Sequence, residues 1–170
     1  MRREGIDMWV LVAREYNEDP VLLTMLPATW HVARRRTILV FFDKGPNTPI
    51  ERIAVARYNI GTFFTSAWNP DEQPDQWKRL AEIITERAPN KIALNYSTTF
   101  GLADGIAYTD YTELMHALPP SVRTKIVSAE NLAVGWLETR TPDEMAVYRH
   151  INRIAHQIVE DGLSEQVITP

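Results

Sequence analysis

The chain contains no cysteine among its 170 residues. This absence excludes disulfide bonds, thiolate metal ligands and a cysteine nucleophile, although it does not identify the cellular compartment. Glycine occurs only seven times, and there is no phosphate-binding loop, dinucleotide-binding pattern or serine-hydrolase elbow. No apolar run approaches the roughly 20 residues that a membrane-spanning helix needs, so we expect no membrane partner.

Basic residues are fewer than acidic ones. Lysine and arginine number 18 against 22 aspartates and glutamates, which gives a net charge of −4. Because nucleic-acid-binding domains are usually basic, we expect no nucleic acid partner. The hydrophobic content of 45% and charged content of 24% are ordinary for globular proteins. The composition and length therefore predict a folded globular chain and argue against a disordered tail.

Strand and helix patterns alternate along the chain. Nearly continuous apolar runs are typical of strands covered on both faces, whereas alternating polarity is typical of a half-covered strand. The alternating segment at 50–58 is expected to pair with the strand before it, which makes part of the sheet antiparallel. The order predicts an α/β fold with a mixed central sheet of about five or six strands flanked by helices. Strands are expected at 6–13, 37–42, 50–58, 91–95 and 125–127, and helices after Asp19-Pro20, after Asn69-Pro70, around 111–118 and after Ser128.

The strongest helix signal comes near the end of the chain. Thr141 and Glu144 are spaced for a capping box, and Pro142 suits the first helical position. We interpret Gly162 as a left-handed helix stop. The apolar stripe of this helix needs a partner surface, which leads us to expect that the chain is the front part of something larger, and we place a boundary at 138–141. The stripe consists of Met145, Tyr148, Ile151, Ile154, Ala155 and Ile158.

Side chains suited to catalysis or metal binding are scarce. His150 and His156 are spaced so that they lie on different faces of a helix and cannot clamp one metal ion. Asp104, Asp110 and Glu113 lie close in sequence but lack calcium-loop spacing, and Asp110 is interpreted as a helix-start residue. We predict no catalytic residue and no metal ligand in this chain.

Two polar segments are candidates for binding. The loop 14–19 follows the first strand, where α/β folds commonly place binding residues, and it includes Tyr16 and Asn17. The segment 30–36 combines an aromatic ring with arginines that can grip carboxylates. Alternatively, the loop only leads into a helix starting at Asp19, and the arginines pair with carboxylates of this chain or of a neighbouring domain. The candidate contact residues are Tyr16, Asn17, Trp30, His31 and Arg34.

The segment 131–149 resembles the junction found in the creatinase/prolidase/Xaa-Pro aminopeptidase family. There, a basic residue, a small residue and an acidic pair introduce the first long helix of the catalytic "pita-bread" domain, as Arg140 to Glu144 do here. Segments 5–9 and 95–101 are similar to a bacterial subgroup, and 161–170 is similar to the segment before the glycine-threonine turn of the family. The resemblance implies a creatinase N-terminal domain with a ribonuclease H-like motif at 1–140, and the first helix of a truncated catalytic domain at 141–170.

The same resemblance implies a function for the whole protein. In that family two divalent metal ions (Mn, Co or Zn) are bound by the C-terminal domain, and none of those ligand motifs occurs in this chain. The resemblance therefore implies a non-catalytic domain of a metal-dependent aminopeptidase or dipeptidase, which shapes substrate access and supports dimerisation. The implied partners are its own C-terminal catalytic domain, a second copy in a homodimer, and a peptide substrate.

The substrate and the activity stay open at the level of sequence. Many family members carry an Asn-x-x-Tyr-x-(Thr/Ser)-Gly motif after the first strand, where this chain has the different sequence Asn17 to Leu23. One alternative is a peptide- or protein-binding module from a relative that has lost its metals. Another is a free-standing α/β domain that binds a small molecule. We expect a cytoplasmic protein, with the periplasm as the alternative if an upstream signal was removed.

Overall fold

The structure is a computed structural model that describes residues 1–164 and 167–168. The chain divides into two compact units, Met1–Leu137 and Glu138–Pro170. The first unit contains the whole sheet, and the second contains the long helix α6 (Pro142–Gly162).

A six-stranded mixed sheet forms the centre of the first unit, in the order β4-β3-β2-β1-β5-β6. β2 pairs antiparallel with both β1 and β3, whereas the pairs β3–β4, β1–β5 and β5–β6 are parallel. This topology confirms the predicted α/β fold with a mixed sheet flanked by helices. The strands are β1 (Met8–Arg14), β2 (Arg36–Phe42), β3 (Glu51–Val55), β4 (Thr65–Ser66), β5 (Ile92–Leu94) and β6 (Ile126–Ser128).

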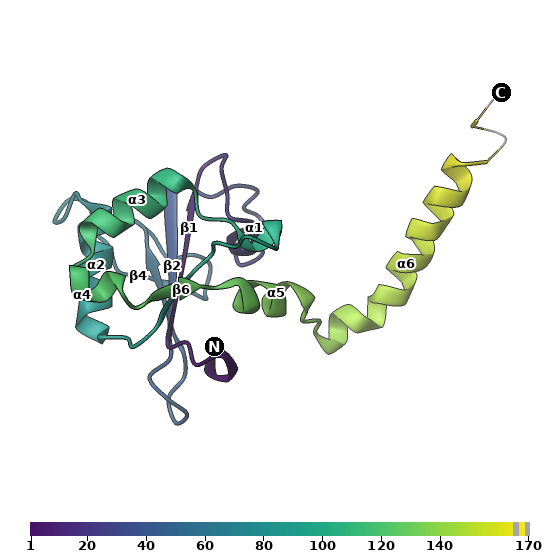
Figure 1. Cartoon of the computed structure of the whole chain (residues 1–170). Helices are drawn as coiled ribbons and strands as arrows, with labels where there is room; N and C mark the ends of the chain where they lie inside the picture. Colours follow the sequence, from purple (N-terminus) through teal and green to yellow (C-terminus); the bar gives the residue numbers. More distant parts are fainter. Residues whose placement is uncertain (165–166, 169–170) are drawn as a thin grey trace. The chain divides into compact units, whose positions relative to one another are not determined.

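Helices cover both faces of this sheet (Figure 1). Successive side chains of a strand point to opposite faces, so Met8 and Val10 of β1 pack in one core cluster while Trp9 and Leu11 pack in the other. α2 and α3 cover the first face, and α1 and α5 cover the second. The helices of this unit are α1 (Pro20–Leu23), α2 (Gln76–Arg87), α3 (Tyr108–Ala117), α4 (Pro120–Arg123) and α5 (Glu130–Glu138), with short 3₁₀ helices at Arg2–Glu4 and Gly101–Ala103.

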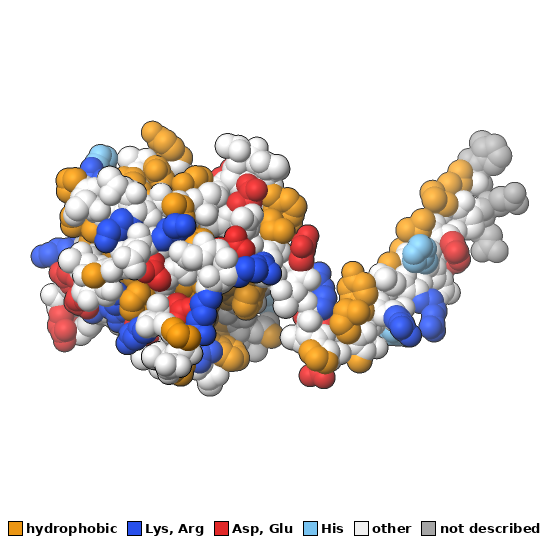
Figure 2. Space-filling view, turned by 60° about the horizontal axis from the view of Figure 1, so that its bottom comes forward, with side chains coloured by type: hydrophobic (Ala, Val, Ile, Leu, Met, Phe, Trp, Pro, Cys, Tyr) orange, Lys and Arg blue, Asp and Glu red, His pale blue; other side chains and the backbone are white. Residues whose placement is uncertain are grey.

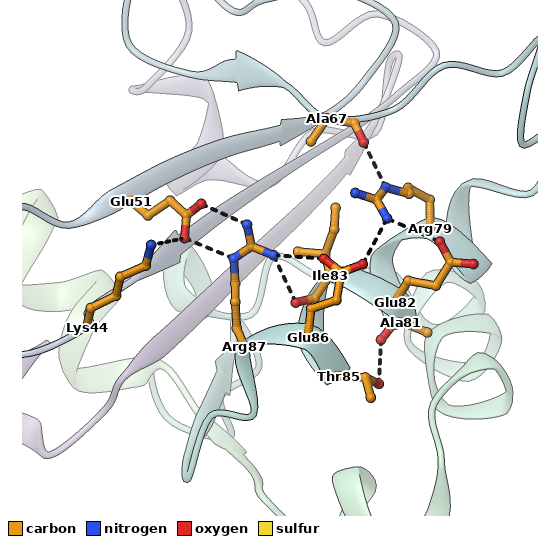
Figure 3. A network of polar contacts seen from close by, with 10 residues as sticks. All are labelled: Lys44, Glu51, Ala67, Arg79, Ala81, Glu82, Ile83, Thr85, Glu86 and Arg87. Carbon is orange, nitrogen blue, oxygen red and sulfur yellow. Dashed lines mark hydrogen bonds and ion pairs between the residues drawn. The ribbon is translucent and has the colours of Figure 1, made fainter.

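α2 is anchored both by its buried stripe and by polar contacts to the sheet. Its buried residues include Trp77, Leu80 and Ile84, and Asp75 caps its first turn. Figure 3 shows Arg87 at its last turn, which donates two hydrogen bonds of 2.9 and 2.7 Å to the carboxylate of Glu51 on β3. The hydrogen bonds from Arg87 hold the pKa of Glu51 below its ordinary value. The end of α2 is therefore tied to the start of β3.

Two predicted helix boundaries are wrong. The helix expected at Asn69-Pro70 begins instead at Gln76, and Asn69 initiates only a local turn that ends before Pro74. Proline disfavours a helical residue before it, which separates this turn from α2. Gly162 is the last helical residue, and the cap is Leu163 with φ −102°, so no left-handed stop is formed.

The strand predicted at 50–58 is shorter than expected, and the expected half-coverage is wrong. Ile53 and Val55 face one core cluster as the alternation predicts, but Ala54 on the other face is also fully buried. The hairpin that follows β3, closed by Ile60 and Phe64, supplies this second cover. A small side chain fits there because another segment lies on top of it.

The second unit has a well-formed helix but no buried residue in α6. The capping box is confirmed, since the Thr141 side chain accepts from the Glu144 backbone N–H and the Glu144 carboxylate accepts from that of Thr141. Hydrophobic side chains run along the helix surface (Figure 2), and Ile151 is 55% exposed. Among the described residues, no helix is long and apolar enough to cross a membrane.

Candidate functional site

The structure brings the two candidate binding segments together where β1 ends and β2 begins, which we call the β1–β2 edge. Antiparallel pairing places Arg14, at the end of β1, opposite Arg36, at the start of β2. The segments 15–19 and 30–35 extend from these ends. The Glu15 backbone N–H donates to the Arg35 carbonyl (2.6 Å), and the Glu18 carboxylate accepts from the Ala33 N–H (3.0 Å). Polar residues far apart in sequence therefore form one continuous surface.

The candidate residues on this surface differ in exposure. Tyr16 is 82% exposed and has a positive φ of 67°, a conformation that costs energy for a residue with a side chain. Asn17 and His31 are exposed, and the described contacts of Asn17 are with the backbone of Arg14. Trp30 is half-buried beside the exposed Arg34. Exposure leaves these side chains available to a ligand.

Arg34 lies against two aromatic rings. Its guanidinium carbon is 4.3 Å from the centre of the Trp30 ring and 5.6 Å from that of Tyr58. The two rings meet edge to face, with centres 5.7 Å apart at an angle of 81°. Such cation–π contacts restrict the guanidinium while its N–H groups stay free to donate. We name Trp30, Arg34 and Tyr58 the Arg34 cluster.

On the α2/α3 face of the same edge, acidic residues pair with two other arginines. Asp110 of α3 lies 3.0 Å from Arg14 and 3.2 Å from Arg36, and Arg36 also contacts Glu113 at 2.9 Å. The Trp77 indole N–H donates to Glu113 (2.6 Å). Burial raises the pKa of Asp110, and the two guanidinium groups counteract part of this rise. The expected helix-start position of Asp110 is confirmed, since it lies in the first turn of α3, although its carboxylate forms ion pairs with Arg14 and Arg36 and makes no cap hydrogen bond.

On the opposite face, Asp19 occupies a fully buried polar network. Its carboxylate accepts from the Val21 and Leu22 N–H groups of α1 and from the Asn95 side chain, all within 2.9 Å. Asn95 in turn accepts from the Trp9 indole (2.8 Å). Gly105 packs so closely here that an added Cβ would lie 2.2 Å from an Asp19 oxygen. The helix-start reading of Asp19 is confirmed, and burial raises the pKa of its carboxyl.

A separate open cleft of about 540 Å³ lies beside α2. Arg57, Trp68, Glu72 and Arg79 contribute to its lining. Arg79 is already engaged, since it donates to the Ala67 carbonyl and pairs with Glu82 (Figure 3). The mixed charges of this lining do not select one class of ligand.

The exposed side chains at the β1–β2 edge are of types suited to binding. No group of three or more histidine, aspartate or glutamate side chains within residues 1–164 and 167–168 is arranged to hold a metal ion. The residues present therefore do not fit a pair of divalent cations. The groups aimed outward at the β1–β2 edge are an arginine and aromatic rings, which suit recognition of a carboxylate.

Sequence reasoning found the two segments but missed several of their partners. Tyr58 completes the Arg34 cluster from the segment after β3, and no local pattern marks it. Asn95 could have been noticed, because polar residues at the carboxyl ends of parallel strands often bind something. Here it binds Asp19 and Trp9, so its role is internal.

Comparison with known proteins identifies the fold. No protein-family model matches the chain, and no curated protein sequence matches it. Among solved structures, the Xaa-Pro dipeptidase from Bacillus anthracis is similar, with a TM-score of 0.50 and 14% sequence identity. The match covers 86% of this chain but 35% of that chain, so this chain spans about a third of the dipeptidase. At this identity the similarity concerns the fold.

Proposed function

We propose that residues 1–140 are the non-catalytic N-terminal domain of a Xaa-Pro peptidase of the creatinase/prolidase type. In this proposal the domain shapes substrate access and supports dimerisation of the enzyme, and residues 141–170 start the catalytic domain. The supporting observation is that a fold covering most of this chain recurs as about a third of a Xaa-Pro dipeptidase. A fold that occurs as one part of a peptidase is suited to serve the chemistry of another part.

The described residues define what this chain contributes. Since they offer no set of metal ligands, paired Mn, Co or Zn ions would be held by residues outside this chain, and no chemical step is assigned to its side chains. Tyr16, Asn17, Trp30, His31 and Arg34 would contact the peptide or the second subunit at the β1–β2 edge. The exposed Arg34 cluster favours a related second candidate, a peptide-binding module in a protein that has lost its metals.

Expression of the complete reading frame that contains this chain, followed by a peptidase assay, tests the proposal. We expect its full product, supplied with manganese or cobalt, to hydrolyse Xaa-Pro dipeptides, and the 170-residue chain to hydrolyse none. Arg34→Ala in the full product should raise KM with little change in kcat, because it removes a binding group and leaves the reacting atoms untouched. Lys78→Ala, an exposed change on α2, is the matched control.

Turnover of a Xaa-Pro peptide by the 170-residue chain would overturn the non-catalytic role. A full product that lacks metal ligands and peptidase activity but binds peptides would support the second candidate instead.

A further inference from the structure

The guanidinium of Arg34 packs against two aromatic rings and forms no ion pair with any described residue. Its guanidinium contacts Trp30 and Tyr58, and no hydrogen bond or ion pair joins it to any residue in the described part of the chain. Arg36 and Arg87 differ, since each pairs with a carboxylate in its own unit. A guanidinium that is ordered by stacking loses less entropy when it binds an anion than a free side chain does.

The acidic residues nearest in sequence to this edge are used for other contacts. Glu18 accepts from the backbone N–H groups of Tyr16 and Ala33, and Glu15 accepts from that of Arg35. These carboxylates keep their charge but bind the backbone of the loops, and no carboxylate of the described residues forms an ion pair with the Arg34 guanidinium.

The aromatic and cationic character continues beyond the Arg34 cluster. The hairpin after β3 packs against the turn before Trp30, since a Cβ on Gly61 would lie 3.3 Å from the Pro27 side chain. Phe63 on this hairpin is 59% exposed, and the guanidinium carbon of Arg52 lies 5.9 Å from its ring centre. Exposed aromatic residues together with arginine are the composition that protein-binding surfaces favour.

We propose that this surface binds an acidic peptide segment, with one side-chain carboxylate of the peptide on the N–H edge of Arg34. Trp30 and Tyr58 hold the guanidinium and provide apolar contact, and Arg52 with Phe63 offers a second cation beside an exposed ring. A peptide with several carboxylates fits better than a single carboxylate, because the cations are distributed over two segments. The inference rests on the proposed function for the location of the surface and adds the chemistry of the ligand.

Fluorescence anisotropy with the 170-residue chain tests this binding without any peptidase activity. The probe is a labelled, acetylated and amidated peptide in which glutamate alternates with serine. Its control has glutamine at every glutamate position. We expect the glutamate peptide to bind and the glutamine peptide to bind at least about tenfold more weakly, as expected for loss of a charge-assisted hydrogen bond.

Variants of the chain distinguish binding by the stacked Arg34 guanidinium from nonspecific electrostatic attraction. Arg34→Ala should weaken binding about tenfold, and Arg34→Lys should lose most of the same affinity, because lysine keeps the charge but not the planar fork. Arg153→Ala removes another exposed charge, on α6, and should change nothing. Arg34 is exposed, so its variants should keep the wild-type thermal midpoint.

Four results would overturn the inference. They are equal binding of the glutamine peptide, full affinity of Arg34→Lys, tighter binding of an oligodeoxythymidine than of the glutamate peptide, and binding only of neutral peptides with a free carboxyl terminus. Either of the first two results would show that the guanidinium fork does not recognise a carboxylate. The third would indicate that the ligand is a nucleic acid, and the fourth that the surface binds a terminal carboxylate. Since hydrolysis is not measured, failure here leaves the proposed function intact.

Discussion

α2 and α6 are both amphipathic helices with side-chain caps, yet only one of them belongs to a core. α2 begins at Asp75 and buries Trp77, Leu80 and Ile84 against the sheet. α6 begins at a complete capping box and has no buried residue. The comparison separates two contributions to a helix: local signals decide where it starts, whereas a facing surface decides how much its apolar stripe stabilises the fold.

The largest expected effect comes from truncating one apolar side chain in each helix. Leu80→Ala should lower the free energy of unfolding by about 3 kcal/mol, because Leu80 is fully buried and the change leaves a cavity. Ile151→Ala in α6 should change it by less than about 0.5 kcal/mol. Urea unfolding followed by tryptophan fluorescence measures both. A similar loss for the two variants would show that α6 also packs in a core.

A second test removes the buried cap of α1. Asp19→Ala should cost about 2 kcal/mol, since it removes a cap and leaves the buried Asn95 amide without its acceptor. The raised pKa of Asp19 means that the folded state binds its proton more tightly than the unfolded state. Stability should therefore fall as pH rises from the ordinary aspartate range through the raised pKa.

Asp19→Asn separates the two effects in urea titrations at several pH values. It keeps the cap but removes the ionisable group, so the loss should be smaller than for alanine and this pH dependence should vanish. An unchanged pH profile in Asp19→Asn would contradict the assignment to Asp19.

A third test weakens the polar link between α2 and β3. Glu51→Gln should cost about 0.5–1 kcal/mol at neutral pH, since the ion pair with Arg87 is partly exposed. The pKa of Glu51 is lowered, so the wild-type contribution is complete above the ordinary glutamate range and is lost as pH falls through the lowered value. Thermal unfolding of both proteins between neutral and acid pH should show their difference shrinking. A constant difference would assign the effect to packing.

The smallest effect on unfolding is expected from removing the capping box of α6, although it is the strongest local helix signal in the chain. Thr141→Ala removes the capping box, which is worth about 1 kcal/mol to a helix. Because α6 buries nothing, the loss should appear as reduced helicity by circular dichroism, with the unfolding midpoint of Met1–Leu137 unchanged. A shift in that midpoint would show that the two units unfold together.

Local chemistry predicted much of the fold. The apolar runs predicted β1 and β2, and the turn residues between 43 and 47 predicted the antiparallel connection to β3. The start of α2 was missed, because Asn69-Pro70 and Asp75 are both plausible helix starts and only Pro74 between them decides. The covered outer face of β3 was missed as well, since the hairpin that buries Ala54 belongs to a different part of the chain.

The candidate site was less predictable than the fold. Trp30 and Arg34 stood out as an aromatic residue beside arginines, but their partner Tyr58 comes from a distant segment. The pairing of Asp110 with Arg14 and Arg36 also joins residues far apart in sequence. Sequence reasoning correctly placed Asp110 at a helix start, but it could not predict these ion pairs, because their partners lie on other strands.

Sequence alone missed β4 and α4, but it predicted the order of five of the six strands and of the longer helices, the caps at Asp19 and Thr141, and the lack of cysteine chemistry. These follow from interactions between residues a few positions apart, which a linear pattern records. Only the tertiary structure decided that Arg36 pairs with carboxylates whereas Arg34 packs against aromatic rings without an ion pair among the described residues. That outcome depends on β1–β2 pairing and on the crossing of segments around residues 30 and 58, and such long-range contacts leave no periodic trace in the chain.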